Sequence, residues 1–209
     1  FMDEVAIEGT NAYSGLDLKV TPTLFFEFHG TPAWVDEQSR LVAEIASGHG
    51  GSDFRWSTDP DERAKLWQAR HDIYWATKAQ RPGCELFTGD ICVPISRLAE
   101  SIVAAREDID ASFLKGQIIG HVGDGNYHTA YLIDPNSKEE LEEAERLSGL
   151  LVERALAVGG TASGEHGIGM GKIKYLRKEH GAAVDVMKRI KAALDPAGIM
   201  NPGKMGQEG

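Results

Sequence analysis

Two histidines flank a glycine-containing turn in the stretch HVGDGNYH, which covers residues 121–128. Asp124-Gly125 is typical of a two-residue hairpin loop, because a type I′ turn needs positive φ at both central positions. A hairpin closed at that point predicts that His121 lies directly opposite His128. Directly opposed residues share a face of the sheet, with Cβ atoms roughly 4.5–5.5 Å apart. Two neutral imidazoles at that separation can hold one metal cation.

The hairpin alone leaves two interpretations of this histidine pair open. One is a metal site, and the other is a polar cross-strand pair in which one ring bonds to a backbone carbonyl. A zinc site normally takes at least three protein ligands, so a metal site needs a further donor from elsewhere in the chain.

A further donor is present in the glycine-rich run GGTASGEHGIGMG, residues 159–171. Such runs are most often flexible connectors, and this one lacks the GxxxxGK[ST] spacing of a phosphate-binding loop. It is unusual in placing an acid next to an imidazole. Glu165 could complete a His₂Glu set with an open position, which is a known catalytic metal pattern. His166 would then be free for proton transfer at the same cavity.

The composition is that of an ordinary globular protein with an excess of acidic residues. The 209 residues carry a formal net charge of −10, which disfavours nucleic acid or an anionic membrane as a general partner. No segment is long and apolar enough to span a bilayer. Cys84 and Cys92 are too few for a disulfide framework and are interpreted as filling a buried strand. The opening FMDE looks like a cut inside a longer protein.

The hydrophobic pattern predicts strands alternating with helices. Strands are expected on both sides of the turn and over residues 21–29, 54–57 and 86–93. Helices are expected as two short elements near the C-terminus and over residues 31–47, 59–79, 96–107 and 137–157. Asp90 is interpreted as structural, with orientation of a ligand as the alternative.

The fold class follows from the hairpin. Its tight turn demands antiparallel pairing, and no GxGxxG follows the first strand, so a parallel doubly wound sheet is rejected. We predict an α+β fold, in which an antiparallel sheet built from ferredoxin-like repeats has helices packed on one face and a helical tail at the C-terminus.

Three motifs together resemble a known family. HVGDGNYH, SGEHGIG and the tail LDPAGIMNPGK are similar to the C-terminal domain of FAD-linked oxidases of the vanillyl-alcohol oxidase type. The stretch LWQARHDIYWATKAQRPGCELFTGDICVPISRLAESI resembles in particular the cytochrome-linked D-lactate dehydrogenase branch. D-2-hydroxyglutarate dehydrogenase and the glycolate oxidase D subunit are close relatives of that branch. The resemblance covers nearly the whole chain, from FFEFHG to NPGK.

The resemblance implies a role for each matching residue. The two hairpin histidines and the loop acid would hold a divalent metal, zinc or manganese, and His166 would be the catalytic base. Arg70 would pair with the substrate carboxylate, Asn126 would lie at the substrate site, and Asn201 would lie where relatives touch the flavin region. Without the resemblance, Arg70 would be interpreted as a solvated helix residue.

The implied activity is the oxidation of a 2-hydroxy acid to the 2-oxo acid, with hydride transfer to FAD. Residues 1–209 would then be the cap or substrate domain, and FAD would be bound mainly by an N-terminal domain absent from this chain. D-2-hydroxyglutarate dehydrogenase has a lysine for the distal carboxylate of its substrate, and the corresponding residue here is Thr88. This difference favours D-lactate or another monocarboxylate.

The expected partners follow from the same resemblance. They are the small 2-hydroxy acid, an electron acceptor such as cytochrome c, an electron-transfer flavoprotein or a quinone, and a second copy of the chain in a homodimer. The expected location is a bacterial cytoplasm or membrane surface, or the mitochondrion of a eukaryote. The alternative within the same class is a D-2-hydroxyglutarate dehydrogenase or a glycolate oxidase subunit. Two alternatives of other classes stay open. One is a metal-binding module without chemistry of its own, and the other is a metallohydrolase with His166 as base.

Overall fold

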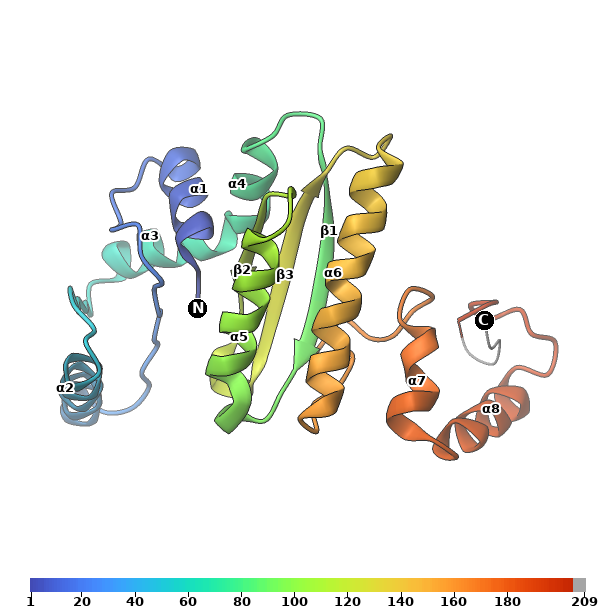
Figure 1. Cartoon of the computed structure of the whole chain (residues 1–209). Helices are drawn as coiled ribbons and strands as arrows, with labels where there is room; N and C mark the ends of the chain where they lie inside the picture. The colour runs from blue at the N-terminus through green and yellow to red at the C-terminus, as the bar shows by residue number, and fades with distance from the viewer. Residues whose placement is uncertain (205–209) are drawn as a thin grey trace.

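A three-stranded antiparallel sheet forms the centre of the chain (Figure 1). It is seen in a computed structural model, which describes residues 1–204. The strands are β1 (Glu85–Cys92), β2 (Gly116–Ile119) and β3 (Asn126–Ile133), and their order in the sheet is β1-β3-β2. The predicted α+β class with an antiparallel sheet is therefore confirmed, with β3 as the middle strand.

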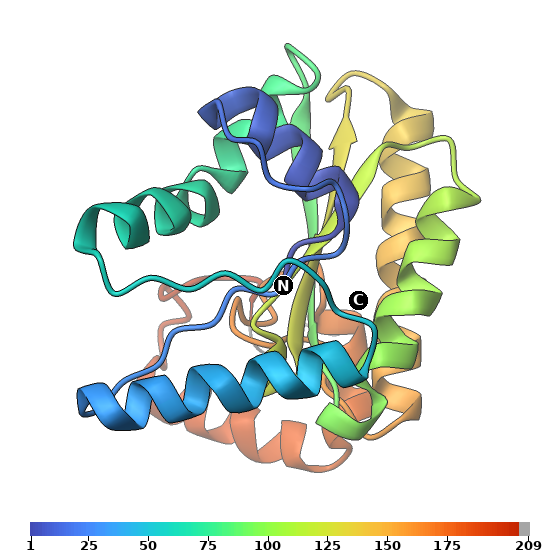
Figure 2. The ribbon, with the colours of Figure 1, turned by 90° about the vertical axis from the view of Figure 1, so that its left-hand side faces the viewer.

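Two long helices, α5 (Ile95–Asp110) and α6 (Lys138–Ala157), cover one face of this sheet (Figure 2). The opposite side carries α1 (Glu4–Ser14) and α4 (Ile73–Ala79), which pack against each other near one end of the strands.

Side chains of β3 alternate between these two faces, because successive residues of a strand point to opposite sides of the sheet. Tyr127 and Tyr131 belong to the apolar cluster beneath α5 and α6. Asn126 and His128 therefore point to the opposite face, together with Asp90, which is paired with His128 across the β1–β3 ladder. The polar residues of the strand pair are thus gathered on the face that α5 and α6 do not cover.

Local signals account for the helices on either side of the sheet. Thr31 caps α2 (Pro32–Gly48) by accepting the N–H of Trp34, and Ser137 caps α6 by accepting the N–H of Glu140. The expected helical tail is present as α7 (Ile173–His180) and α8 (Ala183–Leu194). No helix among the described residues combines the length and the apolar character needed to cross a membrane.

The helix predicted over residues 59–79 is divided into two. It forms α3 (Pro60–His71) and α4, whose axes turn at Asp72 (Figure 1). The Asp72 carboxylate accepts hydrogen bonds from the side chains of Gln68 and Ser14. The contact with Ser14 ties the junction to α1, so a tertiary contact accompanies the change of direction.

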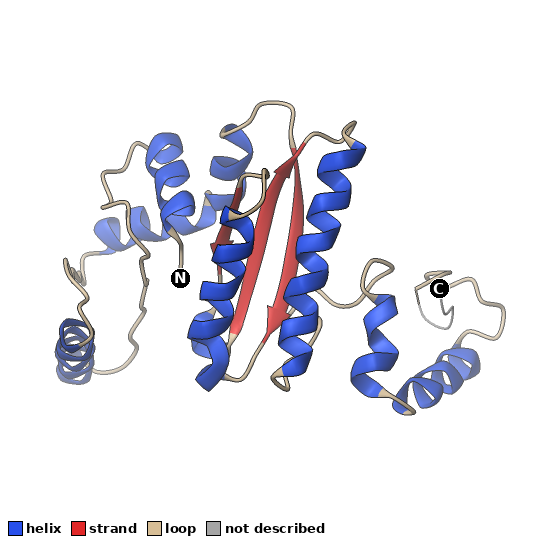
Figure 3. Cartoon of the chain, viewed as in Figure 1, coloured by secondary structure: helices blue, strands red, loops and turns tan. Residues whose placement is uncertain are grey.

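The strands predicted over residues 21–29 and 54–57 are not formed, and long loops run on both sides of α2 instead (Figure 3). In the first segment only Thr23 pairs, in a single bridge with Met2. Met2 also bridges to Ile119 and so occupies the outer edge of β2. A strand needs a neighbouring strand to satisfy its backbone groups, and this short edge offers no room for a longer ladder.

Candidate metal and substrate site

The connection between β2 and β3 is longer than a two-residue hairpin loop. β2 ends at Ile119, which pairs with His128, so the predicted pairing of His121 with His128 is wrong by two residues. Residues Val122–Asp124 form one 3₁₀ turn (η1), and Gly125 alone adopts positive φ there, at 79°. The type I′ prediction is therefore wrong too, because that turn needs positive φ at both central positions.

A tertiary contact explains the different turn. The carbonyl oxygen of Gly125 accepts the N–H of Val93, 3.0 Å away, where the chain leaves β1. A Cβ at Gly125 would lie 2.1 Å from the carbonyl oxygen of Val93, so only glycine allows this approach. The turn is shaped by β1, which lies outside the hairpin.

The two histidines nevertheless lie close together. A slip by an even number of residues leaves a side chain on the same face of a sheet, whereas a slip by one would reverse it. The ring centroids of His121 and His128 are 6.3 Å apart and the rings are nearly perpendicular, at 86°. The prediction that both histidines serve one site is thus compatible with the corrected register.

The glycine-rich loop brings Glu165 and His166 to the same place. Oε1 of Glu165 lies 3.1 Å from Nε2 of His128. Donor atoms of His121, His128 and Glu165 all lie within 4.8 Å of one another, which is the spacing of a possible metal site. The ring of His166 stacks on that of His128, with centroids 4.8 Å apart and an interplanar angle of 7°.

Asp90 lies beneath this group and is only 1% exposed. Its Oδ1 accepts a hydrogen bond from Nδ2 of Asn126 at 2.9 Å. The same oxygen lies 3.2 Å from Nδ1 of His128, although that ring nitrogen is not aligned for a regular hydrogen bond. Its Oδ2 accepts from the Ser163 hydroxyl and from the backbone N–H of Glu165, 3.0 and 3.1 Å away.

The charge of Asp90 is stabilised by these donors. Its Oδ2 also accepts the backbone N–H of His166 at 2.9 Å. Burial alone would raise the pKa of this carboxyl, but the contacts with His128, the His166 N–H and Asn126 outweigh burial and hold the pKa well below its usual range. Asp90 is therefore an anion at every physiological pH.

A second possible metal set overlaps the first. Donor atoms of Asp90, His128 and His166 also lie within 4.8 Å of one another. Both sets use His128; the first adds His121 and Glu165, and the second adds Asp90 and His166. Nε2 of His128 faces Glu165, whereas Nδ1 faces Asp90.

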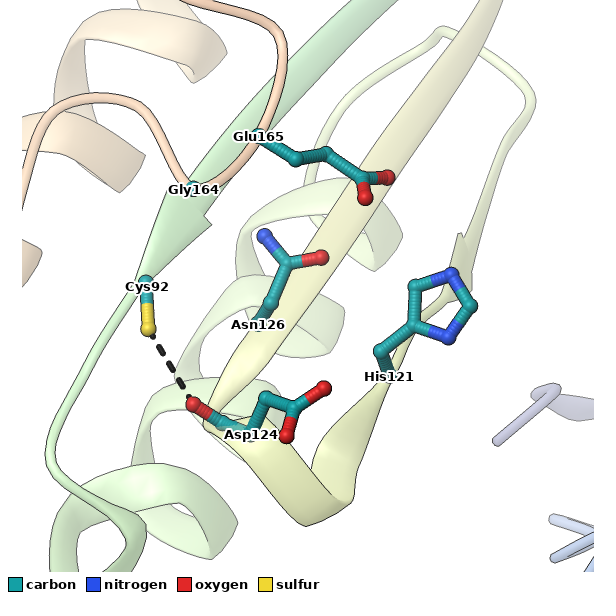
Figure 4. A pocket seen from close by; sticks show the side chains of 6 residues that line it. All are labelled: Cys92, His121, Asp124, Asn126, Gly164 and Glu165. Carbon is teal, nitrogen blue, oxygen red and sulfur yellow. Dashed lines mark hydrogen bonds between the residues drawn. The ribbon is translucent and has the colours of Figure 1, made fainter.

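A cavity of about 360 Å³ opens beside these residues (Figure 4). It is lined by Cys92, His121, Asp124, Asn126, Gly164 and Glu165. The Oδ1 atom of Asn126 is buried without a hydrogen-bond partner among the described residues, and it faces the space between Glu165 and His121. A buried acceptor in this state is available to a ligand.

Arg70 reaches the site from the last turn of α3. Its Nη2 lies 3.4 Å from Nε2 of His121, which places a positive charge next to the proposed ligand group. Asn201 lies in the C-terminal tail with φ 47° and does not line the cavity. The predicted contact of Asn201 with the flavin region stays a prediction.

Sequence reasoning missed the part that Cys92 takes in the site. It was interpreted as filling a buried strand, but its side chain lines the cavity, and its Sγ lies 3.3 Å from the carbonyl oxygen of Asp124. Burial raises the pKa of this thiol, and the nearby Asp124 carboxylate adds to the effect. The alternation along β1 was a usable signal, because Cys92 is two residues from Asp90 and shares its face.

Comparison with known proteins gives one consistent result. The family model "FAD linked oxidases, C-terminal domain" matches residues 1–205. "Probable D-lactate dehydrogenase, mitochondrial" of Danio rerio is 48% identical over 206 residues, which are 98% of this chain and 41% of the relative. "D-lactate dehydrogenase (cytochrome), mitochondrial" of Arabidopsis thaliana is 49% identical over 205 residues, which are 98% of this chain and 36% of the relative. The chain thus spans about two-fifths of the length of these relatives.

A solved structure supports the fold. The 4-ethylphenol oxidase from Gulosibacter chungangensis, in its isoeugenol complex, aligns with a TM-score of 0.55 over 84% of this chain and 37% of that chain. Because the sequence identity is 19%, this likeness concerns the fold alone.

Proposed function

Because the chain belongs to the family of FAD linked oxidase C-terminal domains, we propose that it is the substrate- and metal-binding domain of a flavin-dependent D-2-hydroxy-acid dehydrogenase. The proposed reaction is the oxidation of D-lactate, or a related 2-hydroxy monocarboxylate, to the 2-oxo acid. The names of the two relatives support this substrate. FAD would be bound mainly by a further domain of the parent protein, since the chain spans only about two-fifths of those relatives.

The proposed metal ligands are His121, His128 and Glu165. Ligand atoms around a tetrahedral zinc lie roughly 3.3 Å apart, and the 3.1 Å between Nε2 of His128 and Oε1 of Glu165 fits that spacing. A carboxylate on the far nitrogen of a histidine is also the usual companion of a metal ligand, and Asp90 has that position. The donor set suits zinc or manganese. When bound, the metal supplies a Lewis acid beside the α-hydroxyl of the substrate.

Arg70 would bind the substrate carboxylate. A guanidinium group has only donors, so Nε2 of His121 is the acceptor in their 3.4 Å contact. If this nitrogen becomes a metal ligand, the contact is released and the guanidinium is available to the substrate. A bidentate contact with a carboxylate fixes orientation as well as charge.

His166 would accept the proton of the α-hydroxyl. Its side chain is 53% exposed, its Nδ1 faces Asp90 at 4.0 Å, and its Nε2 lies 3.7 Å from Glu165 on the open side. With a proton on Nδ1, Nε2 would be the nitrogen that accepts the proton of the substrate. When bound, FAD supplies the hydride acceptor.

Thr88 supports a substrate with a single carboxylate. It is exposed on β1, two residues from Asp90 and on the same face of the sheet. A short neutral side chain offers no charged partner to a second carboxylate. We therefore propose that D-lactate is preferred to D-2-hydroxyglutarate.

The proposal extends to the electron acceptor and the location. The name of the Arabidopsis relative supports a cytochrome as acceptor, with an electron-transfer flavoprotein or a quinone as the alternatives. The names of both relatives support a mitochondrial location if the source is a eukaryote. A homodimer stays a prediction.

The observation that carries the proposal is that a His₂Glu donor set, a second imidazole and an arginine meet at one cavity. The test is the absorption spectrum of the full-length protein, recorded without oxygen before and after addition of D-lactate. Flavin bands that D-lactate bleaches are the expected result. A protein without flavin bands would be a hydrolase or a binding module, and faster bleaching by D-2-hydroxyglutarate or glycolate would change the assigned substrate.

A further inference from the structure

One buried carboxylate contacts both elements that supply ligands to the proposed site, strand β3 and the glycine-rich loop. Asp90 comes from β1, yet it contacts His128 on β3 and three donors of the glycine-rich loop. The loop donors are the Ser163 hydroxyl and the successive backbone N–H groups of Glu165 and His166. Successive N–H groups that converge on one anion form a nest, which is a favourable setting for a carboxylate.

The loop is shaped to lie against this carboxylate. A Cβ at Gly164 would lie 2.8 Å from Oδ1 of Asp90 and 1.8 Å from Nδ2 of Asn126, so only glycine allows the backbone to approach so closely. Lys172 closes the far end of the loop by donating from Nζ to the carbonyl oxygens of Asp90 and Ala162. The loop is therefore anchored to β1 on both sides of Glu165.

We infer that Asp90 is the positioning residue of this site: it sets the spacing between His128 and Glu165, two ligands that come from different elements. This inference rests on the proposed function, because it takes His121, His128 and Glu165 as the metal ligands. Nδ1 of His128 lies 3.2 Å from Oδ1 of Asp90, and Nε2 on the other side of the ring faces Glu165. Asp90 also holds the backbone N–H of Glu165 and so places the second ligand against the first.

The same contacts argue against Asp90 as a ligand. A carboxylate offers about four lone-pair positions, and the two oxygens of Asp90 already accept four hydrogen bonds, with the His128 ring beside them. A metal on Asp90 would have to displace donors that already contact its oxygens, two of them from the buried residues Asn126 and His128. Glu165 is 51% exposed, and the contacts of its carboxylate are with the imidazoles of His128 and His166. Its oxygens are the ones open to a cation.

The test is a Zn²⁺ titration of the metal-free, full-length protein and its Asp90→Asn variant. Asparagine keeps the size of the side chain but removes the charge and one acceptor, so we expect Zn²⁺ to bind about 10–100-fold more weakly. Asp3→Asn is the matched control. Asp3 is also buried, at 2% exposed, but its partners are Ala6, Ile118 and Arg106, none of which belongs to the site. The control should bind Zn²⁺ as tightly as the parent.

Visible absorption of Co²⁺ bound in place of zinc gives a second readout, because its bands change with the coordination geometry. A merely structural role for Asp90 predicts a lower melting temperature with unchanged Zn²⁺ affinity and unchanged Co²⁺ bands, and this result would overturn the inference. Loss of Zn²⁺ binding by about 10³-fold or more, well beyond the range for an outer partner, would make Asp90 a ligand and would overturn it too.

Two further variants separate this inference from the proposed function. If Asp90→Asn does not fold, Ser163→Ala removes one loop donor and should weaken Zn²⁺ binding in the same direction but less. Glu165→Ala tests the ligand set itself. If Glu165→Ala keeps full Zn²⁺ affinity, the proposed metal site fails. If Glu165→Ala loses zinc while Asp90→Asn and Ser163→Ala bind it normally, only the positioning role fails.

Discussion

The two faces of the central sheet differ in what they bury, although the same three strands build both. Under α5 and α6 the face is apolar, and its largest side chains, Tyr127 and Tyr131, are almost fully covered. The opposite face buries Asp90, Asn126 and His128. Because side chains alternate along a strand, residues that are neighbours in the sequence belong to these two different environments.

This difference separates residues that stabilise the fold from residues that form the candidate site. Burial of apolar area stabilises the first face without any partner outside the protein. On the second face, the buried Oδ1 of Asn126 has no hydrogen-bond partner within residues 1–204, so it is an acceptor open to a ligand or a water molecule. In natural proteins, residues that serve function are commonly less favourable for stability than other residues would be at the same positions. Substitutions on the two faces should therefore have separable effects.

The largest effect is expected on the polar face, from His166→Ala in the full-length protein. Loss of a general base should lower kcat by about 10²–10⁴-fold, while the metal content stays near that of the parent. Glu165→Ala should lose both metal and activity. Stopped-flow flavin reduction with saturating D-lactate, run beside metal analysis of the same samples, measures both. Equal metal loss in the two variants would place His166 in the coordination sphere.

On the apolar face, Leu147→Ala should act on stability alone. Leu147 belongs to α6, is 2% exposed and packs in the apolar cluster between this helix and the sheet. Truncation of a buried leucine costs about 2–5 kcal/mol of unfolding free energy. Urea denaturation of the full-length protein measures this cost, and Zn²⁺ affinity at low urea should stay unchanged. A variant that loses zinc affinity while folded would show that the two faces are not independent.

Thr88→Lys should change substrate choice by a smaller factor. A charge-assisted contact with a second carboxylate is worth about 1.5–3 kcal/mol, which corresponds to a shift of roughly 10–100-fold in the ratio of kcat/KM for D-2-hydroxyglutarate to that for D-lactate. Thr88→Met is the uncharged control of similar length. A parent enzyme that already prefers the dicarboxylate would contradict the role given to Thr88.

At neutral pH the smallest effect is expected from Tyr127, whose contribution to stability changes only at alkaline pH. Burial raises the pKa of Tyr127 to about 12, and Ser101 accepts a hydrogen bond from its hydroxyl. The folded state therefore keeps the phenol proton more tightly than the unfolded chain, whose tyrosines titrate near 10. Stability should fall between pH 10 and 12, by about 1.4 kcal/mol per pH unit for this group. Tyr127→Phe should show a shallower decline in urea denaturation, and equal slopes would contradict this.

Local signals were sufficient for much of the fold. The helices expected over residues 31–47, 96–107 and 137–157 correspond closely to α2, α5 and α6. Residue types at the turn and in the glycine-rich loop indicated side chains that the fold does bring together. The predicted register was wrong by two residues. An even shift leaves His121 on the same face of the sheet, so the expected closeness of His121 and His128 was not affected.

Long-range contacts account for what the sequence reasoning missed. The turn before β3 is shaped by Val93, and the strand expected over residues 21–29 lacks an edge to pair with. The loop donors of Asp90 lie 73 to 76 residues away from it in the chain. No periodicity or local motif reports contacts of that kind. The sequence alone therefore left two interpretations of Asp90 open, a structural residue and a residue that orients a ligand.

The most direct test of the central claim is anomalous diffraction from crystals of the full-length protein grown with zinc. Data on either side of the zinc absorption edge locate the metal independently of the ligand assignment. We expect one peak, about 2.0–2.3 Å from donor atoms of His121, His128 and Glu165, with His166 outside the coordination sphere. A peak held instead by Asp90, His128 and His166, or no peak on this face of the sheet, would contradict the proposed site.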